Sequence, residues 1–190
     1  KAVLDTKATG ENLLKTDRWG PFEKGFEKDG DAFSCDNGTD SKARRGASQS
    51  IELNQKTAQP IVAVAWSKAD NVGGSPNSDY AIYLDLIYND GTPLWGQTAP
   101  FTCGTHDWER REVIVTPERP VKSVSFHLLL RGHSGKAAFR DAELREVQTP
   151  AGACLFDSIP VAPKVAAAEG FQIRDVVANS NFVRLNREAL

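Results

Sequence analysis

The sequence predicts an all-β protein, an antiparallel β-sandwich of the jelly-roll type. No segment before Ala151 keeps a helical period over ten residues. About eight short segments instead have strand character, and turns rich in Pro, Gly, Asn and Asp separate them. Such a set of strands buries its apolar faces best as two packed sheets, and a jelly roll protects the sheet edges.

The clearest strand signal lies within residues 104–147. Two polar turns at 116–120 and 131–135 divide this stretch into three runs, which predicts three consecutive antiparallel strands. In the middle run the apolar residues Val124, Phe126, Leu128 and Leu130 alternate with Ser123, Ser125, His127 and Arg131. One face should therefore form core, and the other, apart from Leu129, should be polar.

Earlier segments repeat this pattern less regularly. Strands are predicted at 32–35, 47–53, 60–67 and 78–88, the last with Ala81, Tyr83, Asp85 and Ile87 opposite an apolar face. Residues 15–30 and 92–103 are expected to be loops, because they are rich in Gly, Pro or Asp.

The chain divides near Val147. Residues 1–147 are expected to form the sandwich. Residues 148–190 begin with a Pro- and Ala-rich linker-like segment and then contain short strand-like runs. They are interpreted either as a linker with the start of a following module, or as an extension packed on the sandwich.

Composition excludes several partners. The net charge is −2 with a pI near 6.0, and no basic run is longer than Arg44-Arg45, so nucleic acid is not expected. No apolar run approaches the roughly 18 residues of a membrane span. The three cysteines, Cys35, Cys103 and Cys154, form no CxxC pair, which argues against zinc and allows at most one disulfide.

Three stretches carry a family resemblance: GTHDWERREV at 104–113, LLLRGHSG at 128–135 and AFRDAEL at 138–144. Together they resemble the C-terminal half of carbohydrate-binding modules with a galactose-binding-domain-like β-sandwich, and Asn12-Leu-Leu14 is similar to the opening strand of those modules. The resemblance covers about residues 10–147. It implies a secreted, extracellular or cell-surface protein in which this module binds an oligo- or polysaccharide and is covalently linked to a catalytic domain, such as a glycoside hydrolase.

The resemblance also implies a structural calcium ion. Asp141 occupies the position of the second Asp in the closing motif of the family, while Arg140 replaces the first. Calcium needs six to eight oxygen ligands, and the acidic stretch 17–36 could supply more, with Glu23 and Asp31 as the expected partners. The alternative is that these carboxylates only keep a loop soluble.

Sugar binding requires aromatic faces and a few polar groups. Tyr83 and Asp85 share the non-core face of one predicted strand, and His127 and Arg131 share that of another. These four residues, with the loop tryptophans Trp95 and Trp19, are the predicted ligand-binding residues. The remaining tryptophans, Trp66 and Trp108, are expected in the core.

Catalysis has less support in the sequence. Asp85 and Glu112 could serve as a glycosidase pair, but their spacing does not require it. The three histidines have no metal-ligand spacing and no GxSxG motif accompanies them. Two functions remain: a non-catalytic carbohydrate-binding module that directs a larger carbohydrate-active enzyme to its glycan, or a structural, protein-contacting sandwich without a sugar site.

Overall fold

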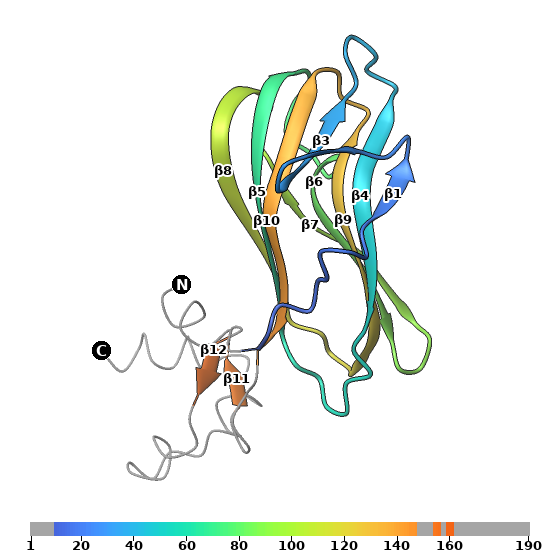
Figure 1. Ribbon diagram of the computed structural model, residues 1–190. Helices are drawn as coiled ribbons and strands as arrows, with labels where there is room; N and C mark the ends of the chain where they lie inside the picture. Colours follow the sequence, from blue (N-terminus) through green and yellow to red (C-terminus); the bar gives the residue numbers. More distant parts are fainter. Residues whose placement is uncertain (1–9, 148–153, 157–158, 162–190) are drawn as a thin grey trace, which may run out of the picture. The chain divides into compact units, whose positions relative to one another are not determined.

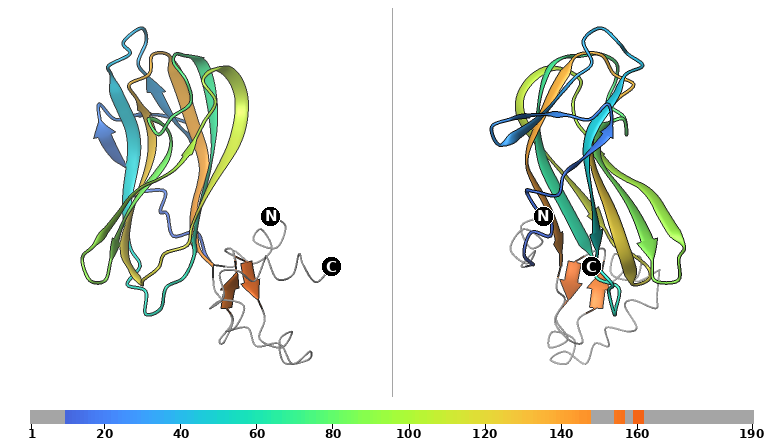
Figure 2. Two further views of the ribbon diagram at one scale, coloured as in Figure 1. Left: turned by 180° about the vertical axis from the view of Figure 1, so that it is seen from behind. Right: turned by 45° about the vertical axis from the view of Figure 1, so that its right-hand side comes forward.

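The computed structural model describes residues 10–147, 154–156 and 159–161. Residues 10–147 contain two five-stranded sheets that face each other (Figures 1 and 2). Sheet A has the order β1 (Gly20–Glu23), β4 (Arg44–Glu52), β9 (Val121–Arg131), β6 (Tyr80–Tyr88), β7 (Pro93–Pro100). Sheet B has the order β2 (Glu27–Asp29), β3 (Ala32–Asp36), β10 (Lys136–Glu146), β5 (Ile61–Val72), β8 (Gly104–Val115).

All neighbouring strands in both sheets are antiparallel, so the predicted all-β antiparallel sandwich is confirmed. No helix among the described residues is long and apolar enough to cross a membrane. A separate two-stranded sheet pairs β11 (Cys154–Phe156) with β12 (Ile159–Val161). The prediction for residues 148–190 otherwise lies outside the described residues.

The three strands predicted within residues 104–147 exist as β8, β9 and β10, but they are not paired consecutively. β8 and β10 both pair with β5 in sheet B, whereas β9 lies between β4 and β6 in sheet A. The polar turns between these strands carry the chain from one sheet to the other. The prediction of pairing between consecutive strands was wrong because alternation of side chains shows which face is buried but not which strand lies alongside.

The core lies between the inner faces of the two sheets. The largest fully buried aromatic side chains are Tyr80, Phe101, Phe126 and Phe139. The ring of Tyr80 lies 5.3 Å from that of Phe101 and 6.0 Å from that of Phe139, and its hydroxyl is 2.7 Å from the hydroxyl of Ser67. Full burial of each large apolar side chain stabilises the fold by about 1.5–3 kcal/mol. The predicted core face of β9 is confirmed, because Val124, Phe126, Leu128 and Leu130 are fully buried.

Strand β7 corrects the prediction that residues 92–103 form an irregular loop. Pro93 and Pro100 stand at the two ends of this strand, which lies at the edge of sheet A and pairs only with β6. Proline is tolerated on an edge strand because its missing N–H is not needed by a second neighbour. Gly96 lies at a register shift and has a φ of 69°, a conformation that glycine adopts without strain. Likewise, β1 and β2 lie within the predicted loop 15–30.

The side chain of Asn12 fastens the opening segment to the closing strand. Asn12 Oδ1 accepts hydrogen bonds from the N–H groups of Leu14 and Leu144, and Asn12 Nδ2 donates to Ala142 O. No strand is assigned to residues 11–15, so the opening strand implied by the family resemblance is replaced by an extended segment held through Asn12. Nearby, β10 has a register shift between Arg140 and Glu143, and Asp141 there has a φ of 49°.

We expect Gly46→Ala to destabilise the fold by about 1–3 kcal/mol, the usual cost of overpacking. Gly46 lies in β4 beside β9, and a Cβ atom at this position would collide with the carbonyl oxygen of Leu128. Gly20 is a matched control, since a Cβ there would lie 3.9 Å from Ser48 O in ordinary contact. Urea unfolding of both variants measures the effect; equal stability of Gly46→Ala and the wild type would contradict it.

Candidate functional site

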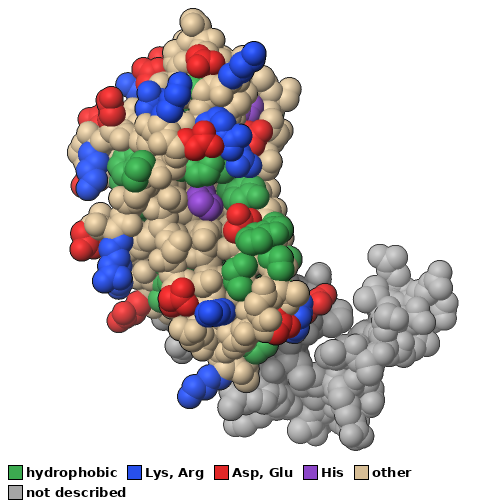
Figure 3. Space-filling view, turned by 90° about the vertical axis from the view of Figure 1, so that its right-hand side faces the viewer, with side chains coloured by type: hydrophobic (Ala, Val, Ile, Leu, Met, Phe, Trp, Pro, Cys, Tyr) green, Lys and Arg blue, Asp and Glu red, His purple; other side chains and the backbone are tan. Residues whose placement is uncertain are grey.

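The outward side of sheet A brings together four of the predicted ligand-binding residues. β6 and β9 are neighbours, with Tyr83 directly opposite His127 and Asp85 directly opposite Ser125. Arg131 stands at the end of β9 on the same side. We call this side the sheet A face; it consists of the outward-pointing residues of β1, β4, β9, β6 and β7, and the view in Figure 3 faces it.

A chain of ring contacts crosses the sheet A face. His127 meets Phe22 and Tyr83 edge to face, with ring centroids 5.7 Å and 6.0 Å apart. The guanidinium of Arg44 lies over the ring of Phe22 at 5.9 Å, and that of Arg131 lies over the ring of Tyr83 at 5.0 Å. Each stacked cation restricts the ring beneath it. The face is therefore built from rings that pack against one another and against two arginines.

Phe22 is a member of this face that the sequence did not indicate. It belongs to β1, a strand of four residues, and four residues are too few to show alternation against a loop background. Leu129, the apolar exception on β9, points outward between Gly46 and Ala81 and is only 1% exposed. The two small neighbours leave room for its side chain.

Trp95 is the large hydrophobic side chain with high exposure in the described part of the chain, at 59%. Its neighbour Leu94 packs against the core, so Trp95 points outward from β7. The N–H of Gly96 donates to Asp85 Oδ1 at 2.9 Å, and the Gly96 Cα lies near the Tyr83 hydroxyl. Asp85 thus holds the backbone next to Trp95, and an indole face remains open to solvent.

Small hydroxyl side chains occupy the middle of the sheet A face. Ser48 lies opposite His127, and Ser50 lies opposite Ser125 with their hydroxyls 3.4 Å apart. Ser123 lies between Glu52 of β4 and Ile87 of β6. Serine hydroxyls both donate and accept hydrogen bonds. Because serine side chains are small, they protrude little from the surface between Phe22 on one side and Tyr83 and Trp95 on the other.

The surroundings of His127 favour the neutral form of its imidazole. Burial lowers the pKa of its imidazole, the charge of Asp85 opposes the effect, and the charge of Arg131 adds to it. Its Nδ1 atom is buried and has no hydrogen-bond partner in the part of the chain that the structure describes. A neutral imidazole with an unused nitrogen can accept or donate one hydrogen bond, depending on its tautomer.

Trp19 does not lie on the sheet A face. Its ring is 4.8 Å from Phe33 and 5.7 Å from Phe126, and it packs against the core at the margin of the two sheets. The sequence placed Trp19 in a loop beside Gly20, but the chain from Gly20 onward forms β1, and the tryptophan turns inward ahead of it. Trp19 is therefore not one of the ligand-binding residues of this face.

The expectation that Trp66 and Trp108 belong to the core was wrong. In β5 Ala65 is core and Ser67 faces Tyr80, so Trp66 between them points outward from sheet B. Trp108 also lies on the outer side of sheet B, where the guanidinium of Arg140 stacks on its ring at 4.1 Å. An apolar residue was assumed to be core, whereas here the arginine covers the indole.

The predicted calcium ligands are only partly brought together. Asp141 and Asp31 line one cavity of about 370 Å³, which Asn12, Lys15 and Lys28 also line. Glu23 lies elsewhere and pairs with Arg44 at 2.6 Å. Within residues 10–147 no group of three or more acidic, His or Cys side chains could hold a metal ion. The side chains fit calcium in part, and the remaining ligands would have to be backbone or amide oxygens.

The imagined glycosidase pair is separated. Asp85 lies on the sheet A face, whereas Glu112 points outward from sheet B opposite Val64 and pairs with Arg110 at 2.8 Å. The two carboxylates therefore lie on opposite outer faces of the sandwich. A glycosidase needs both carboxylates within about 10 Å across one bound sugar.

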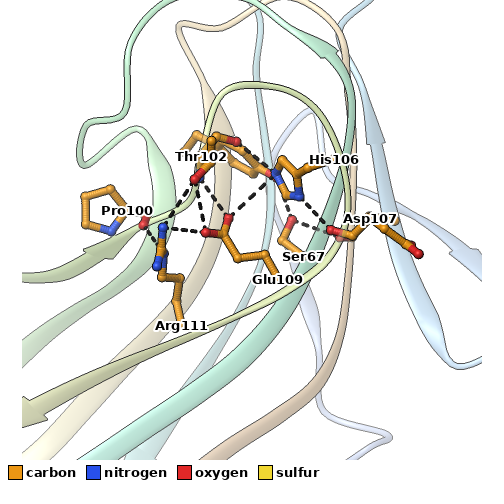
Figure 4. Close-up of polar contacts among 9 residues, drawn as sticks. Ser67, Pro100, Thr102, His106, Asp107, Glu109 and Arg111 are labelled. Atoms are coloured by element: carbon orange, nitrogen blue, oxygen red, sulfur yellow. Dashed lines mark hydrogen bonds and ion pairs between the residues drawn. The ribbon is translucent and has the colours of Figure 1, made fainter.

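A polar cluster fastens the connection between β7 and β8 (Figure 4). Glu109 accepts hydrogen bonds from the N–H and hydroxyl of Thr102 and pairs with Arg111, whose Nε donates to Pro100 O. Both ring nitrogens of His106 lie within hydrogen-bond distance of backbone carbonyls, those of Asp107 and Thr102. His106 thus hydrogen-bonds locally, and the cluster ties the edge of sheet A to the edge of sheet B.

Both cysteines whose side chains are described are free. Cys35 is buried, which raises the pKa of its thiol to about 12, and Cys103 is partly buried. A thiol with a raised pKa is a poor nucleophile near neutral pH. The side chain of Cys154 lies outside the described residues.

We expect acid to weaken the fold through His127. An unfolded histidine titrates near about pH 6.5, whereas burial depresses the pKa of folded His127. The stability linked to its neutral form is complete above about pH 6.5 and is lost as pH falls through the lower folded pKa. Thermal melts between about pH 7.5 and about pH 5 should therefore show a smaller loss of Tm in His127→Gln than in the wild type. Equal losses would contradict this account.

The chain is similar to parts of known proteins, but these similarities do not assign it to a family. No family model matches the sequence. The chain is similar to the tRNA nuclease WapA of Bacillus subtilis, with 28% identity over 116 residues, covering 55% of this chain and 5% of that protein. It therefore spans a small fraction of the length of this curated relative.

Two solved structures are similar at low identity. The CBM22-1 xylan-binding domain from Paenibacillus barcinonensis Xyn10C has a TM-score of 0.48 and 13% identity, covering 74% of this chain and 97% of that chain. A CBM4 structure has a TM-score of 0.43 and 19% identity, covering 73% of this chain and 93% of that chain. Neither similarity assigns an activity to this chain.

Proposed function

We propose that this chain is a non-catalytic module that binds a polysaccharide through the sheet A face. The observation that carries the proposal is the exposed indole of Trp95 beside Tyr83 and Asp85, next to a strip of serine hydroxyls. Flat rings accommodate the C–H side of a pyranose, and hydroxyls and carboxylates bind its O–H groups. The face offers both kinds of group over several strands, which suits an extended chain of sugars.

The contacts among the side chains of the face support this proposal. Tyr83 is held by Arg131 and His127, and the backbone beside Trp95 is held by Asp85. Side chains that are already ordered lose less conformational entropy when a ligand binds, so weak sugar contacts suffice for measurable affinity. The resemblance of residues 104–144 to carbohydrate-binding modules is independent support.

The role within a longer protein is part of the proposal. A module of this kind would hold a covalently linked, secreted carbohydrate-active enzyme on its glycan, outside the cell or at its surface. The competing function is a structural sandwich that contacts another protein through the same face. Exposed aromatic patches also occur at protein interfaces, so binding of glycans decides between the two functions.

Trp95→Ala should lower the affinity for a bound polysaccharide about tenfold, since removing a central aromatic contact costs more than 1 kcal/mol. A glycan array identifies the polysaccharide, and affinity gel electrophoresis measures the change. Trp108→Ala is the matched control, because that tryptophan lies on the outer side of sheet B. Failure of the wild-type protein to bind any of a broad set of polysaccharides would overturn the proposal.

We also propose a structural calcium ion at the Asp141 cavity. Added calcium should raise the melting temperature of the wild type, and Asp141→Ala should remove this rise, because a carboxylate ligand would be lost. Glu23→Gln is the control, as Glu23 pairs with Arg44 away from this cavity. An unchanged response to calcium in Asp141→Ala rejects Asp141 as a ligand.

A further inference from the structure

Two arginines meet at one end of the sheet A face. Arg44 of β4 and Arg131 of β9 are directly opposite each other in the antiparallel register. Cβ atoms of such residues are about 5 Å apart, and two like charges in this position destabilise a sheet. The side chain of Arg44 is 50% exposed and that of Arg131 is 21% exposed, so an anion in solvent can reach both.

Each of the two arginines pairs with one carboxylate among the described residues. Arg44 binds Glu23 through Nε at 2.6 Å, and Arg131 binds Asp79 through Nε. In both ion pairs Nε is the arginine atom that meets the carboxylate, and the hydrogen bond from Arg131 to Asp79 also comes from Nε, which leaves the terminal Nη atoms as further donors. Guanidinium groups bind a carboxylate best through two parallel N–H groups, and the Nη atoms supply such donors.

The surroundings have a local excess of positive charge. Arg44, Arg131 and Lys42 line a shallow surface depression. Asp79 is the acidic residue among its lining residues. Even with Glu23 included, the cations outnumber the carboxylates, whereas the whole chain has a net charge of −2. An anionic group placed here would relieve the repulsion between the two arginines.

The depression is continuous with the aromatic rings of the face. Arg44 lies over Phe22 and Arg131 lies over Tyr83, while His127 joins the two rings by edge-to-face contacts. A sugar ring on these aromatics would place its substituents within reach of the guanidinium groups. A charged substituent on that sugar would meet the arginines without any movement of the strands.

We infer that the ligand of the sheet A face is an acidic polysaccharide, with a uronate carboxylate bound between Arg44 and Arg131. This inference rests on the proposed function and adds the chemical class of the glycan. A carboxylate matches the paired donors of a guanidinium better than a neutral hydroxymethyl group does, because the hydrogen bonds are charge-assisted. Neutral glycans would contact only the rings and the serines.

The test compares uronate polymers with their own methyl esters. Polygalacturonate, alginate and glucuronoxylan are each tested beside their methyl-esterified form, which keeps the sugar ring and removes the charge. By affinity gel electrophoresis at about 50 mM salt, we expect the wild type to bind at least one de-esterified polymer about tenfold more tightly than its ester. Raising the salt to about 500 mM should remove most of this difference.

Substitutions of single arginines test whether the preference for uronate depends on Arg44 and Arg131. Arg44→Gln should lower affinity for the de-esterified polymer about tenfold and affinity for the ester much less, because the ester loses only the contact of Arg44 with Phe22. Arg131→Lys, which keeps the charge and removes the paired donors, should also weaken uronate binding. Arg119→Gln is the matched control, since Arg119 likewise pairs with a carboxylate, Asp90, and stacks on a tyrosine, Tyr88, at 4.4 Å. Thermal melts of all variants verify folding.

The outcomes separate this inference from the proposed function. Binding of neutral and acidic polymers with equal affinity, lost in Trp95→Ala, would overturn the acidic preference and leave sugar binding intact. Binding of dextran sulfate as tight as that of the uronate polymers would overturn the carboxylate assignment. No binding of any polymer would overturn both. A uronate preference lost in Arg44→Gln but kept in Arg119→Gln supports the inference.

Discussion

The packing of aromatic rings between the two sheets is the interaction on which the rest of the structure depends. Tyr80 contacts Phe101 and Phe139 in the centre of the core, and Phe126 lies inside from β9. Because successive side chains of a strand point to opposite sides, an inward Tyr80 and Phe126 require Tyr83 and His127 to point outward. The same contacts that stabilise the fold therefore assemble the sheet A face.

The sequence predicted those parts of the fold that depend on alternation within one strand. It identified the inner face of β9 and the outward positions of Tyr83 and His127, because period-two alternation of apolar residues is a local property. It did not predict that β8 and β10 flank β5, because strand pairing depends on contacts between distant residues. Strand β7 was missed because its edge position, which permits its prolines, appears only in the assembled sheet.

The two outer faces of the sandwich differ in a way that composition alone does not reveal. On sheet B, Val62 and Val64 run along β5 and are almost completely buried, and the ion pairs Arg110–Glu112 and Arg145–Glu143 belong to the flanking strands. On sheet A, small serines leave the middle of the face low, and Trp95 stays exposed. The presence of a tryptophan on a face is therefore a poor guide to a binding face, and the accessibility of each indole is the useful quantity.

The most direct test of the central claim follows the indole N–H signals of the four tryptophans during titration with a soluble oligosaccharide of the bound glycan. The side-chain N–H of each tryptophan gives a separate signal in a nitrogen-15 correlation spectrum, so one experiment examines both outer faces and the core. Binding on the sheet A face predicts a large shift for Trp95 and little change for Trp66, Trp108 and Trp19. Shifts of Trp66 and Trp108 with an unchanged Trp95 would place the ligand on sheet B and contradict the account.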